Sequence, residues 1–378
     1  MLVATIIILT ITAIYVYLVV KCCIVFHNYD DNTSKSSTTS TLKISVPSVS
    51  SVRDPLCATD IIVAAKNESQ NITKFLDSIK AQTLDGAHLI LIDDNSTDNT
   101  YDLAQSRQDV NITLLKSPGK GKKQALNHGI AHSKAHYILS TDADCFPQPR
   151  WAETLVGAAQ NVDADMIMAP VIIEAPDKTK MFQRLWQAES FALITITAGT
   201  CIAGRPVMCN GGNIGYRSTF IKKSIGDING KYASGDDMFM MESAGKQHKR
   251  FVYAKNPDAV IRTDGVENIH QLLNQRARWV SKTGGYTDYY ILFFAFAILL
   301  GNLAAIAAPI LWACGGAWWM ALTVLLLKFA ADFASVRVSS EYYDEHQRII
   351  DVIVLGIVYP YYVVAAIFTF WGRGFKWK

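Results

Sequence analysis

Two aspartates, Asp142 and Asp144, stand one residue apart at the end of an apolar run. Residues 136–141 predict a strand, so both carboxylates leave its carboxyl end on a loop. Oxygen ligands at this spacing can bind one hard divalent cation, Mg2+ or Mn2+, and leave positions open for phosphate oxygens. The competing interpretation is a cap before the helix that Pro147 and Pro149 introduce, because Asp is common there. The pair indicates a nucleoside diphosphate site only if the surrounding elements support it.

Carboxylates also follow two other predicted strands. Glu68 comes shortly after the apolar run 60–65, and Asp93 and Asp94 come directly after the run 88–92. Strands of this length alternate with helices of about ten residues, which predicts right-handed crossovers and a mostly parallel sheet. Ligands gather at the carboxyl ends of such strands. We therefore expect these acids near the aspartate pair.

Lysines and a later acidic pair complete the candidate site. The loop 116–123 contains Lys122 and other lysines, which suit diphosphate oxygens. The Gly-rich turn 210–213 lets the backbone approach a ligand, although ordinary turns look the same. Asp236 and Asp237 precede a helix expected to start at residue 238, where acids are common caps. If that loop faces the metal site, one of the two carboxylates is placed to take a proton.

A polar and aromatic group, Gln275, Arg278 and Trp279, precedes an apolar segment. An arginine can bind phosphate through two hydrogen bonds, and a tryptophan can stack on a sugar ring. Anchoring of basic and aromatic side chains at a membrane surface would explain the same residues. Earlier in the chain, after the aspartate pair, residues 165–173 predict a strand. Residues 178–200 suit a helix that lies on the core or in the membrane interface.

Four apolar stretches predict an integral membrane protein with a soluble middle. Residues 2–20 carry no charge and, at about 1.5 Å per residue, can cross a hydrocarbon core of about 30 Å. The basic start and cleavage site of a signal peptide are both missing, so an uncleaved anchor is favoured. Residues 289–312, 318–334 and 350–371 are three further apolar segments with Trp and Tyr near several borders.

Charge and cysteine usage narrow the function classes. The net charge of +3 and the lack of a dense basic run with aromatics argue against nucleic acid as a partner. The seven cysteines show no paired metal-type spacing, and their odd number fits a reduced compartment better than a disulfide framework.

Taken together, seven motifs occur in a recognisable order between about residues 60 and 286. They are Val63-Ala-Ala-Lys-Asn67-Glu68, Asp93-Asp94-Asn-Ser-Thr-Asp98, Gly119 to Asn127, Asp142-Ala-Asp144, Asn210-Gly-Gly-Asn213, Gly235-Asp236-Asp237 and Gln275-x-x-Arg278-Trp279. This set resembles the membrane-bound family 2 glycosyltransferases, whose relatives include cellulose, chitin and hyaluronan synthases. The resemblance implies an α/β nucleotide-sugar-binding (GT-A) fold, Rossmann-like with a mostly parallel sheet, flanked by transmembrane helices.

The resemblance also implies roles for the motif residues. The donor nucleotide would meet Glu68 and Asp94 at the uracil or ribose, with Asp93 the second choice. Lys122, together with Asp142, would contact the diphosphate. The divalent cation, Mg2+ or Mn2+, would be held by Asp142 and Asp144.

The general base would be Asp237, although the family usually has Glu-Asp where this chain has Asp236-Asp237. A frequent Pro of the first loop is here replaced by Ala64. The pyrophosphate and acceptor side would be lined by Gln275, Arg278, Trp279, Asp236 and Asn213.

The implied reaction is metal-dependent, inverting transfer from a nucleoside diphosphate sugar, with UDP favoured, to a glycan or lipid-linked acceptor. A processive polysaccharide synthase is the alternative within the family. The chain has only about four predicted spans, which makes a wide polymer channel hard to build. This favours limited addition or an oligomeric pore, and an accessory subunit stays possible. An inactive nucleotide-sugar-binding scaffold and a nucleotidyltransferase are the rivals from other classes.

The domain boundaries follow from these assignments. We expect an anchor at 1–26, a Ser/Thr-rich linker at 27–54, a GT-A domain at 55–263, an interfacial segment at 264–288, a transmembrane region at 289–371 and a basic tail at 372–378. Nucleotide sugars are made in the cytosol, so the catalytic domain should lie on the cytoplasmic side of the cell (inner) membrane, among membrane lipids.

Four full spans would place both termini outside, whereas the basic tail prefers the inside. The last segment, interrupted by Pro360, is therefore suspected to be re-entrant or interfacial. On the segment before it, Lys328 and Asp332 lie four residues apart and are expected to pair on one helix face. Such a pair either serves function within the membrane or marks the membrane boundary.

Overall fold

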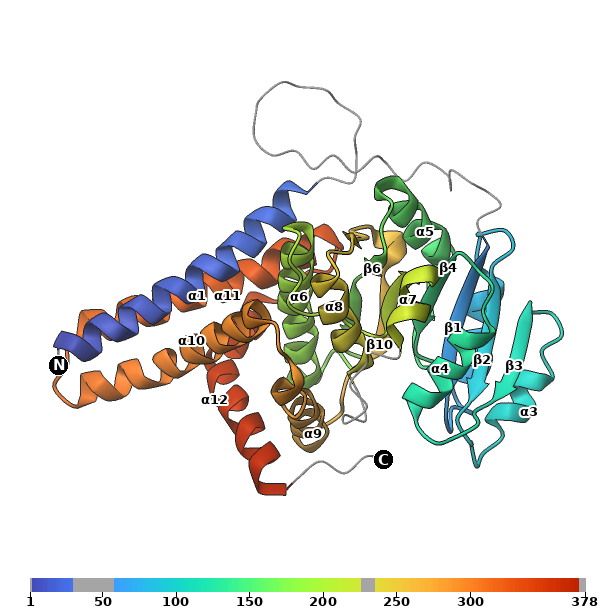
Figure 1. Ribbon diagram of the computed structural model, residues 1–378. Helices are drawn as coiled ribbons and strands as arrows, with labels where there is room; N and C mark the ends of the chain where they lie inside the picture. The colour runs from blue at the N-terminus through green and yellow to red at the C-terminus, as the bar shows by residue number, and fades with distance from the viewer. Residues whose placement is uncertain (1, 30–57, 226–234, 374–378) are drawn as a thin grey trace. The chain divides into compact units, whose positions relative to one another are not determined.

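The structure is a computed structural model that describes residues 2–29, 58–225 and 235–373 (Figure 1). Most of the predicted linker and most of the basic tail lie outside the described residues. The chain divides into two compact units. The helical unit comprises Met1–Asn28, Ile173–Thr200 and Asp264–Lys378, and the α/β unit comprises Tyr29–Ile172 and Cys201–Thr263.

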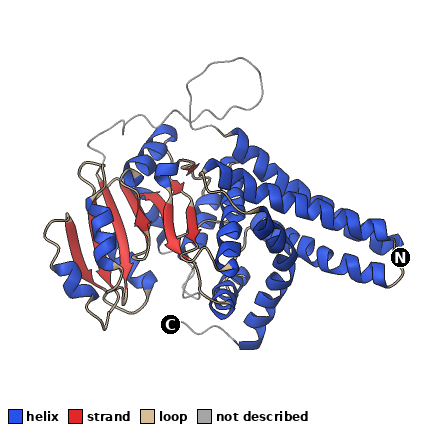
Figure 2. Cartoon of the chain, turned by 180° about the vertical axis from the view of Figure 1, so that it is seen from behind, coloured by secondary structure: helices blue, strands red, loops and turns tan. Residues whose placement is uncertain are grey.

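The α/β unit is built on a seven-stranded sheet in the order β3-β2-β1-β4-β8-β6-β9, drawn among the red strands of Figure 2. Strand β1 pairs in parallel with β2 and β4, and β8 is antiparallel to β4 and β6. The predicted mostly parallel sheet is therefore confirmed. The strands are β1 Thr59–Ala65, β2 His88–Asp93, β3 Ile112–Lys116, β4 Tyr137–Thr141, β6 Met166–Met168, β8 Asn213–Arg217 and β9 Phe251–Tyr253.

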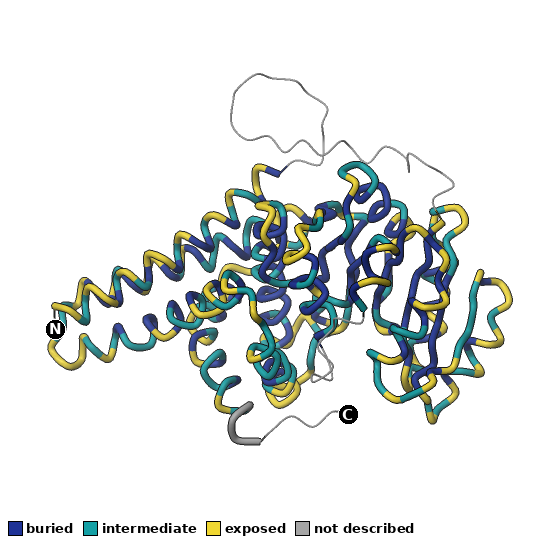
Figure 3. Tube along the Cα trace, in the orientation of Figure 1, coloured by how far each residue is buried: buried dark blue, intermediate teal, exposed yellow. Residues whose placement is uncertain are grey.

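Helices connect these strands and supply the core. Residues of both sheet faces are buried along β1, β2 and β4, as Figure 3 shows in dark blue, because helices cover a parallel sheet on both sides. Trp151 and Phe75 are fully buried in this core. The helices are α2 Ile72–Lys80, α3 Thr100–Gln105, α4 Lys122–His132, α5 Trp151–Val162, α7 Ser218–Ser224 and α8 Asp236–Lys246.

The strand predicted at 165–173 is two strands in the structure. After β6 ends, β7 (Val171–Glu174) joins a separate three-stranded sheet with β10 (Ile261–Asp264) and β5 (Phe146–Pro147). Pro170 lies between β6 and β7 and has no N–H to donate to a sheet ladder. The single apolar run of the sequence therefore serves two sheets.

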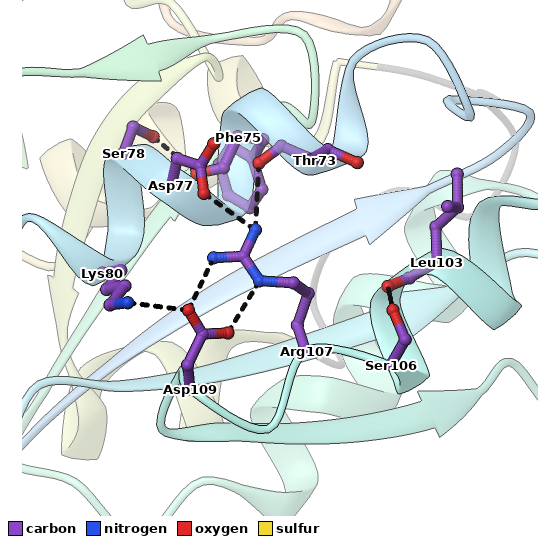
Figure 4. Close-up of polar contacts among 9 residues, drawn as sticks. All are labelled: Thr73, Phe75, Asp77, Ser78, Lys80, Leu103, Ser106, Arg107 and Asp109. Carbon is purple, nitrogen blue, oxygen red and sulfur yellow. Dashed lines mark hydrogen bonds and ion pairs between the residues drawn. The ribbon is translucent and has the colours of Figure 1, made fainter.

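A cluster of charged side chains ties α2 to the segment after α3 (Figure 4). Arg107 donates to Asp109 through Nε at 2.7 Å and forms an ion pair with Asp77 at 2.9 Å. Lys80 Nζ also lies 2.8 Å from Asp109. The charges of this cluster satisfy one another on a largely exposed surface, so its role is structural.

The helical unit contains four helices that are long and apolar enough to cross a membrane by length and composition. Large apolar side chains such as Ile6, Phe296 and Leu326 are exposed on them, which suits contact with lipid. The helices of this unit are α1 Leu2–Asn28, α6 Met181–Ile202, α9 Ile269–Val280, α10 Tyr289–Ala313, α11 Trp318–Tyr342 and α12 Ile349–Arg373.

Two expectations about these helices have an outcome in the structure. Pro360 does not break its segment, because α12 continues on both sides of it. The predicted pairing of Lys328 with Asp332 is confirmed, with Nζ 2.5 Å from Oδ2. Asp332 Oδ1 also accepts a hydrogen bond from the Tyr15 hydroxyl at 2.5 Å, which the spacing within α11 could not reveal. The pair therefore joins α11 to α1.

Helix α6 packs inside the helical unit. Trp186 and Phe191 are buried on it, and the Phe191 carbonyl accepts a hydrogen bond from Ser339 of α11. The sequence left open whether this helix lies on the core or in the membrane interface. The structure shows it packed against other helices of the helical unit.

Candidate active site

The carboxyl ends of β1, β2 and β4 bring the predicted acids to one edge of the α/β unit. Ala65, the last residue of β1, is in register with Asp93, the last of β2. Strand β4 runs parallel to β1 and ends at Thr141, directly before Asp142. The loops that follow these strands consequently leave the same edge of the sheet.

Asp142, Asp144 and Cys145 form a cluster suited to a cation. One ligand atom of each lies within 4.8 Å of the other two. Burial, followed by the negative charge of Asp142, raises the pKa of Asp144. A divalent cation would relieve the repulsion between these carboxylates, so the oxygen set fits Mg2+ or Mn2+.

Cys145 was missed at the sequence level because a lone cysteine has no ligand spacing. Its side chain is 3% exposed and its Sγ lies 3.6 Å from Asp144 Oδ1. Burial and the charges of the two aspartates raise the pKa of this thiol, so it stays protonated and is a poor ligand for a hard cation. The two carboxylates remain the suitable ligands.

Lys122 stands at the start of α4 and contacts Asp142 Oδ1 with its ammonium group. Burial lowers the pKa of Lys122, but the negative charges of Asp142 and Asp237 outweigh that effect and the pKa is raised. The lysine is therefore a fixed positive charge beside the cation cluster, where an anionic ligand can be neutralised.

Asp237 lies in the first turn of α8 and is held by the Gly-rich turn. Its Oδ2 accepts a hydrogen bond from the Gly211 N–H at 2.9 Å. A Cβ on Gly211 would lie 3.1 Å from that oxygen, and a Cβ on Gly212 would lie 3.6 Å from Asp142 Oδ2. The glycines therefore let the turn fit between Asp237 and Asp142, which are distant in the sequence.

Asp236, the neighbour of this acid, has a different environment. It forms an ion pair with Lys123 at 3.5 Å, which links the first turns of α8 and α4. Burial raises the pKa of Asp236, while the charge of Lys123 opposes that rise. Its predicted place on the acceptor side stays a prediction.

The loop that carries Glu68 is bonded to the loop after β2. Asp98 accepts hydrogen bonds from the Ser69 N–H at 3.1 Å and the Thr100 N–H at 3.0 Å. Asn67, at a φ of 56°, accepts a hydrogen bond from the Thr97 N–H at 2.8 Å. The site edge is thus shaped by side chains that satisfy loop N–H groups.

The Glu68 carboxylate accepts a hydrogen bond from Asn71 Nδ2 at 2.8 Å. Burial raises the pKa of Glu68, and the charges of Asp144 and Asp142 add to the rise. The charges of Asp144 and Asp142 act on Glu68, so the structure brings Glu68 near the cation cluster.

Asp93 and Asp94 are more enclosed than their predicted donor roles suggest. Asp94 is 4% exposed, and its two oxygens accept from the Gly121 N–H at 2.8 and 3.0 Å. Asp93 is 5% exposed and accepts from the Ser96 N–H at 3.3 Å. Asp94 therefore holds the loop that leads into Lys122, and contact of either acid with a nucleotide stays a prediction.

Asn213 is a core residue, contrary to its predicted place on the acceptor side. It is 1% exposed, its Oδ1 accepts from Trp151 Nε1 at 2.8 Å, and its Nδ2 donates to the carbonyls of Pro170 and Ala259 at 2.7 and 2.8 Å. The amide hydrogens and the oxygen are already used. Asn213 thus anchors the end of the Gly-rich turn to the core through these hydrogen bonds.

Gln275, Arg278 and Trp279 lie on α9 of the helical unit, and their predicted contacts with substrate stay predictions. Sequence reasoning missed the importance of Arg276 between them, which is buried and bonded to Glu189 of α6. A signal was present, because an acidic side chain in a helix expected to pack on a core or in the membrane interface needs a partner for its charge.

Comparison with known proteins agrees with this geometry. The family model described as "Glycosyl transferase family 2" matches residues 60–224, which hold the strand ends, Lys122 and the two aspartates. Glycosyltransferase GlyG of Streptococcus pneumoniae is 32% identical over 111 residues, or 29% of this chain and 37% of that protein. A poly-beta-1,6-N-acetyl-D-glucosamine synthase of Staphylococcus aureus is 32% identical over 93 residues, or 24% of this chain and 23% of that protein. The chain therefore spans well under half the length of these relatives.

A solved structure shares the fold over most of the chain. It is a mannosyltransferase from Pyrobaculum calidifontis in complex with GDP-Man and Mn2+, with a TM-score of 0.56 and 16% sequence identity. The similarity covers 96% of this chain and 99% of that one. The expected GT-A fold, with four membrane-capable helices flanking it in the sequence, is confirmed.

Proposed function

We propose that this chain moves a sugar from a nucleoside diphosphate sugar to a glycan or lipid-linked acceptor, and we start from the match of residues 60–224 to the family model described as "Glycosyl transferase family 2". One observation carries the proposal. The Gly211-Gly212 turn lies between Asp237 and Asp142, and Lys122 contacts Asp142. A base, a cation-binding pair and a fixed positive charge thus occupy one edge of the sheet, which is what this transfer requires.

Neutralisation of the leaving diphosphate is the first requirement. Asp142 and Asp144 would hold Mg2+ or Mn2+, which supplies Lewis-acid stabilisation of the leaving phosphate oxygen. Lys122 is already charged beside Asp142 and would exchange part of that contact for diphosphate oxygens. In the proposal, Arg278 supplies a second positively charged side chain to the diphosphate.

Removal of a proton from the acceptor hydroxyl is the second requirement. In the proposal Asp237 takes this proton as the acceptor oxygen bonds to the anomeric carbon and the nucleoside diphosphate leaves. The Gly211 N–H fixes one oxygen of Asp237, so the other oxygen can face the acceptor. A single direct displacement inverts the configuration at the anomeric carbon. A positioned base typically contributes 10²- to 10⁴-fold to such a step.

Binding of the donor is assigned to the loops at the strand ends. Glu68, Asp93 and Asp94 belong to loops bonded to one another and to the loop before α4, so little ordering is needed on binding. Acceptor contacts are assigned to Gln275, Arg278, Trp279 and Asp236. Asn213 is withdrawn from this set because its amide is used in the core.

For the membrane arrangement, we propose that α1, α10, α11 and α12 place the protein in the cell (inner) membrane with the α/β unit in the cytoplasm. Their length and hydropathy support insertion. The supply of nucleotide sugars in the cytosol supports the orientation. Processive synthesis is the second candidate, supported by the polysaccharide synthase among the relatives.

The test is a donor screen with the full chain in lipid nanodiscs. UDP- and GDP-sugars are offered with Mn2+, Mg2+ or EDTA, and the released nucleotide and product length are measured. We expect a nucleoside diphosphate to be released only with a divalent cation. Formation of sugar 1-phosphate and a nucleoside triphosphate when pyrophosphate is added would identify a nucleotidyltransferase instead, and donor binding without turnover would identify an inactive scaffold.

A further inference from the structure

A buried charged cluster in the helical unit plays no part in the proposed transfer chemistry. Glu189 lies on α6, Arg276 on α9 and Tyr362 on α12, and their exposed fractions are 2%, 5% and 7%. Ionised groups lose hydration when they are buried, so they persist there only when partners replace the water. The contacts of these three residues therefore deserve a specific explanation.

The three side chains form a closed ring of hydrogen bonds. Arg276 Nη2 donates to Glu189 Oε2, and Arg276 Nε donates to the Tyr362 hydroxyl at 2.7 Å. That hydroxyl donates in turn to Glu189 Oε1 at 2.5 Å. A planar guanidinium bonded through two donors to two different groups has one orientation, so the ring fixes the Arg276 plane with groups from two other helices.

The fixed guanidinium lies against Trp279. The distance from the Arg276 guanidinium carbon to the centre of the Trp279 ring is 3.9 Å. The two residues are three apart on α9, so they are neighbours on the helix surface. An arginine over an indole face is held by cation–π attraction, which is stronger where water is excluded. The orientation of the Trp279 ring thus depends on Arg276, and through it on Glu189 and Tyr362.

We propose that Glu189, Arg276 and Tyr362 are positioning residues that hold the Trp279 indole ready for a sugar ring of the acceptor. This inference rests on the proposed function, which assigns Trp279 to the acceptor side. None of the three needs to touch the acceptor, because they act through Trp279. A ring that is ordered before binding costs less to use, so losing the support weakens acceptor binding and slows transfer.

A second ion pair in the same unit provides a matched control. Arg184 of α6 donates to Asp351 of α12 through Nε at 2.8 Å and Nη2 at 3.1 Å. This ion pair joins α6 to α12, the helices that also carry Glu189 and Tyr362. The arginine that stacks on Trp279 is Arg276. A lysine at either arginine keeps the charge and loses the planar fork. Arg184→Lys therefore reproduces the loss of a helix-linking fork without removing the stacked guanidinium.

The structural arm of the test follows Trp279 directly. The near-ultraviolet circular dichroism of the full chain in nanodiscs is compared with that of Trp279→Phe, and the difference isolates the signal of this indole. The same difference is then measured in each of the backgrounds Arg276→Lys, Glu189→Gln and Tyr362→Phe, with and without Trp279→Phe. We expect it to be at least about twofold smaller than in the wild type, because a Trp279 ring that can turn averages its surroundings. Arg184→Lys should leave it intact. An unchanged difference in Arg276→Lys and Tyr362→Phe would overturn the proposal.

The functional arm uses octyl β-D-glucoside and octyl N-acetyl-β-D-glucosaminide as acceptor probes. In Arg276→Lys and Tyr362→Phe, kcat/KM for the acceptor should fall about tenfold or more, while the Kd of UDP or GDP with Mn2+ changes less than twofold. Arg184→Lys should stay within twofold for both. A lost dichroism signal with unchanged acceptor kinetics would overturn the inference. If the wild-type protein turns over no donor, the proposed function and the acceptor role fail together, and the dichroism still decides whether the ring fixes Trp279.

Discussion

The two units hold several of their acids in different ways. In the α/β unit the acids near the strand ends accept hydrogen bonds from backbone N–H groups, as Asp94 does from Gly121 and Asp237 from Gly211. In the helical unit acids meet buried bases, as the buried Glu189 meets Arg276 and the half-buried Asp332 meets Lys328. A backbone donor orients a carboxylate without cancelling its charge, whereas a salt bridge does cancel it.

This difference separates groups available for chemistry from groups that hold helices together. Burial, followed by the negative charge of Asp142, raises the pKa of Asp144, which favours a cation or a proton as a partner. The ion pairs in the helical unit need no cation, because each acid is neutralised by a basic side chain of the same unit. Substitution of Asp142, Asp144 or Asp237 should therefore affect turnover, and substitution of the Lys328–Asp332 pair should affect stability.

The largest effect is expected for Asp237→Asn. The amide keeps the shape and can still accept from the Gly211 N–H, but it cannot take a proton at neutral pH. Transfer should fall by about 10²- to 10⁴-fold, while UDP or GDP with Mn2+ binds as before. Turnover and nucleotide titration of the two proteins measure this.

A surface variant is the control for that comparison. Arg107→Ala removes contacts to Asp109 and Asp77 on the outside of α2 and should leave turnover unchanged. Equal loss in both variants would mean that damage to the fold, and not loss of the base, explains the effect. Unchanged turnover in Asp237→Asn would remove that residue as the base.

In the helical unit, Lys328→Met is expected to destabilise without acting on chemistry. It leaves the half-buried Asp332 beside Tyr15 without its cation, at a cost of about 3 kcal/mol. The double variant Lys328→Met/Asp332→Asn keeps an acceptor for the Tyr15 hydroxyl and should recover most of that loss. Thermal unfolding in nanodiscs checks both. If the double variant is stable but cannot transfer sugar, the pair serves function as well as structure.

A smaller effect is expected for Asn213→Ala, which tests the boundary between site and core. Removing the amide leaves Trp151 Nε1 and two carbonyls without their partner, so stability should fall by about 2 kcal/mol. Turnover per folded molecule should change little, because the amide does not face a substrate. A stable variant with a large loss of activity would restore Asn213 to the acceptor side.

Much of the α/β unit was predictable because its information is local. The apolar runs and the acids that follow them are contiguous in the sequence, and the parallel arrangement follows from the alternation of strands and helices. The aspartate pair could be recognised as a candidate cation site for the same reason. Pro170 shows the limit, since an apolar run alone does not reveal that its two halves join different sheets.

What could not be predicted depends on partners far away in the sequence. The amide of Asn213 is used by Trp151, Pro170 and Ala259, none of which is a neighbour along the chain. Arg276 looked like one more basic residue near a membrane segment, and only the fold pairs it with Glu189. Polar residues of the same type take structural or chemical roles according to these distant partners.

The central claim is that Asp142 and Asp144 bind a divalent cation that the transfer requires. The most direct measurement is release of nucleoside diphosphate from the donor by the wild-type protein and by Asp142→Asn, each titrated with Mn2+ and with Mg2+. Turnover by the wild type should saturate with the cation and vanish in EDTA, and Asp142→Asn should lose about 10²-fold or more at every concentration. Full turnover in EDTA, or an Asp142→Asn variant with unchanged cation dependence, would contradict the account.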